Sequence, residues 1–125
     1  MFSVLRIRST ARDQETDTLR FNTLLHTLDL LDRELRAERR GLKERCERIA
    51  ATAAFAQERF ESNDQENALS KQIDEMTRSM KNYTRRMNAL QRQIDLVGQL
   101  RATASTFTAD HRPPPEPREA TSLRH

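Results

Sequence analysis

Residues 69–97 read LSKQIDEMTRSMKNYTRRMNALQRQIDLV, and the spacing of their apolar side chains decides the fold. Steps of four and three residues alternate through the series Leu69, Ile73, Met76, Met80, Tyr83, Met87, Leu90, Ile94 and Val97. This is the heptad repeat of a coiled coil, with Ile73, Met80, Met87 and Ile94 at position a and the others at position d. Because a single amphipathic helix is marginal in water, the stretch requires a second apolar stripe.

The composition argues against a large globular core. Of the 125 residues, 35% are hydrophobic, 5% are aromatic and 33% are charged. A long seam between two helices needs fewer apolar residues than a globular core does. Disorder is the alternative that such a composition leaves open, and the regular heptads argue against it.

The second stripe lies in the first half of the chain. One series of heptad positions consists of Phe21, Leu24, Leu28, Leu31 and Leu35. A later series keeps the same rhythm in another phase and consists of Leu42, Cys46, Ile49, Ala53, Ala56 and Phe60. The change of phase predicts a stutter, a four-residue insertion that locally unwinds a supercoil. Because Gly41 lies at the junction, we expect a bend or a loose seam near residues 39–43.

Polar residues separate the two stripes. Residues 61–67 read ESNDQEN, and residues of this kind favour turns and helix caps, with Ser62, Asn63 or Asp64 as the cap of the second helix. The sequence therefore predicts an all-α fold, a long two-helix antiparallel coiled-coil hairpin over residues 10–108. Its helices span 10–61 and 67–106, a turn spans 62–66, and Phe21 lies near Phe107. A continuous rod that dimerises through both stripes is the alternative.

The two ends of the chain differ from the predicted hairpin. Residues 1–9 form an N-terminal segment with a few apolar side chains, either a docking segment or a frayed helix start. Thr10 and Asp13 resemble a capping box at the start of the first helix. After Val97 several threonines lower the helix propensity, so we expect the second helix to fray. Residues 109–125 contain four prolines and predict a disordered, proline-rich tail.

The residue types that carry catalysis do not cluster in this fold. His26, His111 and His125 lie far apart in any hairpin, and we expect a structural role for His26 beside the apolar stripe. There is no glycine-rich phosphate loop. Cys46 is the only cysteine and lies on the predicted seam, where it acts as a small apolar residue. We therefore expect a non-enzymatic protein with no cofactor, no metal site and no small-molecule ligand.

The charge and the hydropathy of the chain limit where the protein can be located and which partners it can have. The formal net charge is +3, but acidic and basic residues are mixed and no aromatic residues interleave with the arginines, which disfavours nucleic acid as a partner. No apolar run reaches the roughly 18 residues of a membrane span. A single cysteine and the lack of a secretory signal at the start favour a cytoplasmic protein.

Two short segments resemble a known family. The sequence LRIR at residues 5–8, followed by Arg12 and an acidic helix start, resembles the beginning of YscO-type type III secretion proteins. The sequence LSKQI at residues 69–73, followed by heptads, resembles a second stretch of the same family. These proteins and the flagellar FliJ proteins are antiparallel helical hairpins.

The resemblance implies a function in protein transport. A stalk of this family is thought to sit in the ring of the secretion ATPase, contact the export gate and pick up empty chaperones. It makes Leu5, Ile7, Arg8 and Arg12 candidate partner-docking residues in this chain. The alternative is a generic coiled-coil adaptor or scaffold protein without a role in secretion, for which a homodimer is one arrangement.

Overall fold

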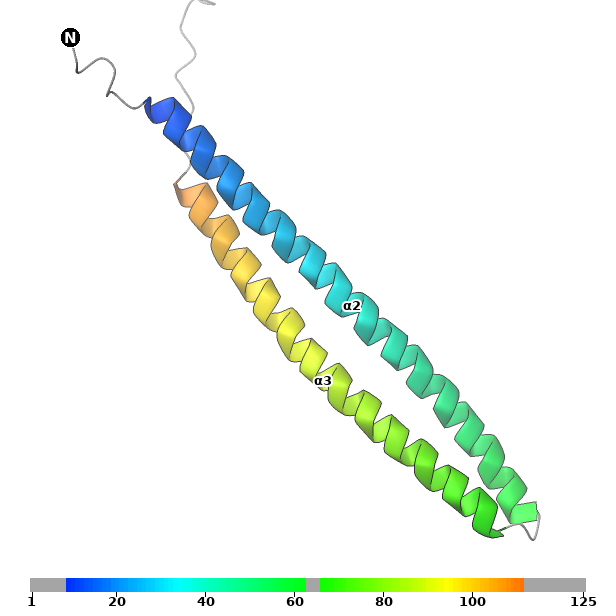
Figure 1. Cartoon of the computed structure of the whole chain (residues 1–125). Coiled ribbons are helices and arrows are strands. Elements are labelled where there is room, and N and C mark those ends of the chain that lie inside the picture. The colour runs from blue at the N-terminus through cyan, green and yellow to red at the C-terminus, as the bar shows by residue number, and fades with distance from the viewer. Residues whose placement is uncertain (1–8, 63–65, 112–125) are drawn as a thin grey trace, which may run out of the picture.

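Two long helices lie side by side in opposite directions (Figure 1). The computed structural model describes residues 9–62 and 66–111, which contain helix α2 (Thr10–Ser62) and helix α3 (Glu66–Asp110). At about 1.5 Å per residue the helices are about 80 Å and 68 Å long. The chain is therefore the all-α helical hairpin that the sequence predicts.

The helices extend slightly beyond the predicted bounds. Ser62 is the last residue of α2 and not the cap of the second helix, while Asn63 and Asp64 lie outside the described residues. Instead of fraying, α3 continues to Asp110. Ala104 and Thr108 are half-buried there, and the Thr108 hydroxyl donates to the carbonyl of Ala104 at 2.9 Å. Packing against α2 thus outweighs the weak helix propensity of this stretch.

Ser9, and not Thr10, caps the start of α2. The Ser9 hydroxyl accepts a hydrogen bond from the backbone N–H of Arg12 at 3.3 Å, and the Ser9 carbonyl accepts one from the N–H of Asp13 at 3.0 Å. The first contact satisfies an N–H group that has no partner inside the helix, and the second is the first backbone hydrogen bond of the helix. The rest of the predicted N-terminal segment, residues 1–8, and the proline-rich tail from residue 112 lie outside the described residues.

The stripe of residues 69–97 forms the α3 side of the seam, as predicted. All nine of its apolar residues are buried or half-buried. Three contacts fix the register against α2: Phe21 lies against Phe107, Cys46 against Met80 and Glu38 against Arg86. Since residues early in α2 meet residues late in α3, these contacts describe one antiparallel register between Phe21 and Cys46 of α2.

The predicted stutter in α2 is wrong. Burial follows an unbroken four-three rhythm through Phe21, Leu25, Leu28, Asp32, Leu35, Arg39, Leu42, Cys46, Ile49, Ala53 and Ala56. The two apolar runs therefore share one phase, and α2 continues through Gly41. The sequence pattern predicted a stutter because it placed the apolar Leu24 and Leu31 in the seam. In the structure these two residues lie beside the seam, and Asp32 and Arg39 occupy seam positions.

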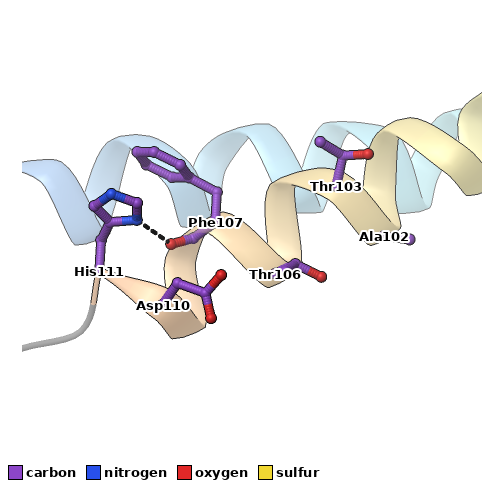
Figure 2. Close-up of a pocket in the computed structure, with 6 residues that line it drawn as sticks. All are labelled: Ala102, Thr103, Thr106, Phe107, Asp110 and His111. Atoms are coloured by element: carbon purple, nitrogen blue, oxygen red, sulfur yellow. Dashed lines mark hydrogen bonds between the residues drawn. The ribbon is translucent and has the colours of Figure 1, made fainter.

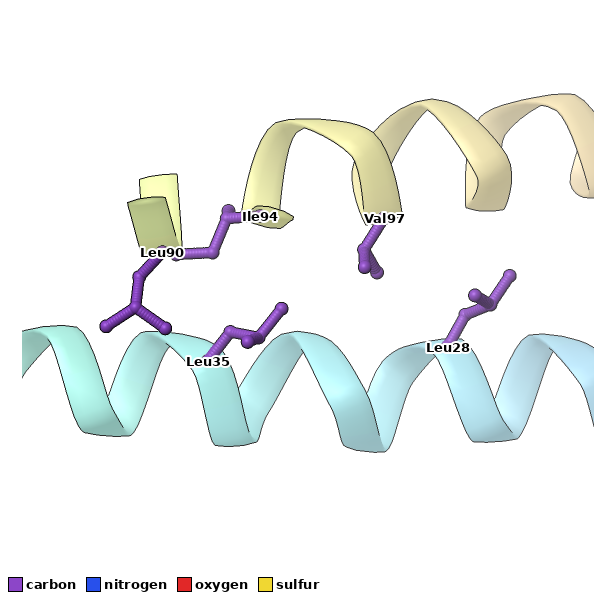
Figure 3. Close-up of a cluster of buried hydrophobic side chains, with 5 residues drawn as sticks. All are labelled: Leu28, Leu35, Leu90, Ile94 and Val97. Atoms are coloured by element: carbon purple, nitrogen blue, oxygen red, sulfur yellow. The ribbon is translucent and has the colours of Figure 1, made fainter. Parts of the chain in front are cut away.

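The tightest packing lies in the half of the hairpin nearer to the helix ends Thr10 and Asp110. The cluster of buried side chains consists of Leu28, Leu35, Leu90, Ile94 and Val97, and Figure 3 shows them interleaved between the two helices. Leu90 is fully buried. Two ion pairs between the helices bracket this cluster, Asp29 with Arg101 at 2.7 Å and Glu38 with Arg86 at 2.7 Å. In both pairs α2 supplies the acid and α3 the arginine, which favours this register and orientation.

Candidate protein-binding surface

The structure places one of the four predicted docking residues. Arg12 is exposed on the first turn of α2, whereas Leu5, Ile7 and Arg8 lie outside the described residues. Because Phe21 lies against Phe107 near the end of α3, the first turns of α2 project past that end (Figure 1). The projection is about 12 Å at the usual helical rise. Arg12 therefore lies on a single helix that α3 does not cover.

The projecting turns of α2 and the turn that follows them carry both signs of charge. Asp13 lies in the first turn of α2, and Asp17 pairs across 3.7 Å with Arg20, which lies just past the projecting part on the exposed surface. Exposed pairs of this kind contribute little to stability and are screened by salt. The surface can thus offer its charges to a partner at little cost to the fold.

Three aromatic rings close this end of the hairpin. The ring centroids of Phe21 and Phe107 lie 5.0 Å apart, and those of Phe107 and His111 lie 4.0 Å apart and nearly parallel. The His111 Nδ1 lies 2.9 Å from the carbonyl oxygen of Phe107, which only accepts, so Nδ1 carries the proton (Figure 2). Sequence reasoning found the Phe21–Phe107 contact but assigned His111 to the tail. The four-residue spacing of Phe107 and His111 was the available signal.

Beside these rings lies an apolar groove. Its volume is about 420 Å³, and its lining is Phe21, Leu24, Leu28, Leu100, Thr103, Ala104 and Phe107. Both helices contribute, so the groove depends on the hairpin being folded. Sequence reasoning missed it because Leu24 was assigned to the core, whereas 43% of this side chain is exposed.

Exposed apolar side chains extend the groove into a longer surface, which we name the apolar flank. It consists of Leu24, Leu31, Leu96, Leu100 and Phe107, which are between 39% and 54% exposed. In the heptads of the seam, Leu24 and Leu31 on α2 and Leu100 and Phe107 on α3 occupy position g. Nearer the turn, Glu38 and Arg86 occupy the same position. One side of the hairpin therefore changes from charged to apolar along its length.

Glu38 and Arg86 are a charged pair at position g, where coiled coils normally carry charged residues. The hydrogen bond from Arg86 lowers the pKa of the Glu38 carboxyl below its ordinary value, and the same contact raises the pKa of Arg86. Both side chains remain about half exposed. Charged pairs here cover the seam and keep the surface compatible with water.

Other candidate chemical groups lie apart from one another. His26 is exposed and does not pack beside the stripe as expected. Cys46 is half-buried on the seam, as predicted, with Sγ 3.8 Å from the carbonyl oxygen of Met80. Within residues 9–62 and 66–111, no three His, Cys, Asp or Glu side chains lie close enough together to hold a metal ion.

The fold and these surfaces define the chain as an antiparallel two-helix hairpin protein with charged faces and one apolar flank. No protein-family model, curated protein or solved structure matches it. Neither α2 nor α3, over the residues described, has a stretch long and apolar enough to cross a membrane.

Proposed function

We propose that this protein is a non-enzymatic component of a type III protein secretion apparatus, acting in the cytoplasm as the stalk of the secretion ATPase or as an escort for chaperones. The observation that supports this most is the hairpin itself, a long antiparallel pair of helices whose first helix projects past the second. The resemblance of residues 5–8, Arg12 and residues 69–73 to YscO-type proteins supports the secretion role.

The proposed mechanism is mechanical and electrostatic. A continuous seam and two ion pairs join the helices into one rod, which would insert into a ring. The projecting turn of α2 then presents the exposed Arg12 to an acidic protein surface, and the resemblance adds Leu5, Ile7 and Arg8 as candidate docking residues. Because the Arg12 charge is exposed, binding should weaken as the salt concentration rises.

A binding experiment with the cognate secretion ATPase tests this proposal. We expect the full chain to bind the ATPase hexamer at low salt and Arg12→Glu to weaken binding about tenfold. Arg40→Glu is the matched control, because Arg40 is exposed in the middle of α2 and the substitution changes the net charge equally. No binding at low salt, or equal loss in the two variants, would contradict the proposal.

A generic adaptor or scaffold protein is the alternative function. The apolar flank favours it, because exposed apolar patches rimmed by polar residues mark protein-binding surfaces in general. The genes beside this one discriminate between the two functions. Secretion genes there would favour the stalk or escort, and unrelated genes would favour the adaptor.

A further inference from the structure

We propose that the apolar flank is an interface between two copies of this chain, which pair side by side as an antiparallel four-helix arrangement. This inference does not depend on the proposed function. It concerns a different surface from the projecting turn of α2 that carries Arg12.

The heptad pattern around the flank is that of a bundle and not of an isolated pair. A two-helix coiled coil needs apolar residues at positions a and d alone, and charged residues normally fill position g. Helices of larger bundles add a third apolar position per heptad. Leu24, Leu31, Leu100 and Phe107 supply that third position on both helices over the same length of the hairpin.

The charges beyond the flank on α2 are complementary to those of a second copy. Arg20 and Glu34 lie at equal distances in sequence on either side of Thr27, and all three residues are exposed on the same heptad position. A two-fold axis crossing the flank at the level of Thr27 places Arg20 of one copy opposite Glu34 of the other. The same axis brings Leu24 of one copy to within one residue of the level of Leu31 of the other, and the contact is reciprocal because it is isologous.

Helix α3 fits the same axis. The register set by Phe21 with Phe107 and Cys46 with Met80 puts Leu100 at the level of Thr27. Leu100 of one copy would therefore meet Leu100 of the other near the axis, with Phe107 to one side of it.

Other acids near this surface would not oppose the pairing. Arg20 lies 3.7 Å from Asp17 of its own chain and would also face Glu34 of the other copy, and Glu38 accepts hydrogen bonds from Arg86, so an arginine lies beside each of these acids. The flank covers about 16 Å of α3, from Leu96 to Phe107, so the contact is small. We therefore expect a weak dimer with a Kd in the micromolar range.

Sedimentation analysis of the full chain tests the proposal. We expect a dimer whose fraction rises with protein concentration, measured up to about 1 mM. At that concentration half of the chains would be paired even if the Kd were about 1 mM. Leu31→Glu should raise the Kd about tenfold or more. Leu30→Glu is the matched control, since Leu30 is comparably exposed (44%, against 39% for Leu31) but points away from the flank, and it should leave the Kd unchanged.

A charge exchange tests the geometry without disturbing the apolar residues. Arg20→Glu and Glu34→Arg should each weaken the dimer about threefold, and the double variant should restore it, because the opposite charges again face each other. A chain that stays monomeric would overturn the proposal. So would a dimer that tolerates Leu31→Glu while the variant remains helical, or a double variant as weak as the single ones.

Discussion

Arg86 on α3 donates two hydrogen bonds to the carboxylate of Glu38 on α2, from Nε to Oε2 at 2.7 Å and from Nη2 to Oε1 at 3.2 Å. Residues 48 positions apart in the chain thus meet in a two-pronged contact that only one register of the helices permits. The contact lies at the boundary where the flanking positions change from charged to apolar. It holds the helices together beside the seam while leaving the apolar flank free.

The Glu38–Arg86 pair predicts a pH dependence. Because the pKa of Glu38 is lowered in the folded chain, its contribution to stability is present above the pKa of the unfolded chain and is lost as the pH falls through the folded pKa. The difference in melting temperature between the wild type and Glu38→Gln should therefore shrink from about pH 7 to about pH 3. Glu47→Gln, at an exposed position on the same helix, serves as the control. A difference that stays constant with pH would contradict the assignment.

Leu90 predicts where the fold is most sensitive. Its side chain is fully buried in the cluster with Leu35 and Ile94, so Leu90→Ala leaves a cavity. We expect the free energy of unfolding to fall by about 2–5 kcal/mol, measured by urea denaturation followed by circular dichroism. Leu30→Ala, on the exposed back of α2, should cost less than about 1 kcal/mol. Similar losses in both variants would mean that the seam does not dominate stability.

The periodicity of residues 69–97 was sufficient to predict the hairpin. All nine residues of the heptad series in that stretch lie in the seam, because no other regular apolar series in it competes for the same face, and Leu96 is the exposed exception. In α2 two apolar series overlap, and the heptads through Leu24 and Leu31 are as regular as those through Leu25 and Leu28. The apolar residues alone do not indicate which series is buried, because the series that faces α3 includes the charged residues Asp32 and Arg39. Only the packing of α3 reveals which phase is buried.

The candidate sites were less predictable than the fold. Arg12 is exposed, but the apolar flank emerges only when Leu24 and Leu100, far apart in the sequence, are brought to one side of the hairpin. A periodic pattern specifies which residues share a face of one helix. It does not specify how the faces of two helices combine into a groove, so a surface made from both helices required the register.

Gly41 offers a test of the continuous α2 helix. Its backbone is helical, with no positive φ at either glycine, and a Cβ placed on it would have nothing within 4 Å. Because alanine is better than glycine in a helix interior, Gly41→Ala should stabilise the chain by about 0.5–1 kcal/mol and raise the melting temperature by several degrees. Gly98→Ala should act in the same direction for the same reason. A decrease for Gly41→Ala would indicate that the helix needs a flexible joint there.

Arg39 predicts a gain in stability from removing a charge. It occupies position a of the seam, and its buried Nε has no hydrogen-bond partner among the residues that the structure describes. An unsatisfied buried polar group costs about 1–3 kcal/mol, whereas methionine would fill the same space with apolar atoms. Arg39→Met should therefore raise the free energy of unfolding by about 1 kcal/mol, measured by urea denaturation.

Arg40→Met is the control for Arg39→Met. Arg40 is the exposed neighbour on the same helix, so its substitution should change stability by less than about 0.5 kcal/mol. A charged residue at position a also restricts the number of helices that can pack together, at a cost in stability. Arg39→Met should then broaden the range of oligomers seen by sedimentation, while Arg40→Met should not. A loss of stability in Arg39→Met would mean that the guanidinium group makes favourable contacts that outweigh its burial.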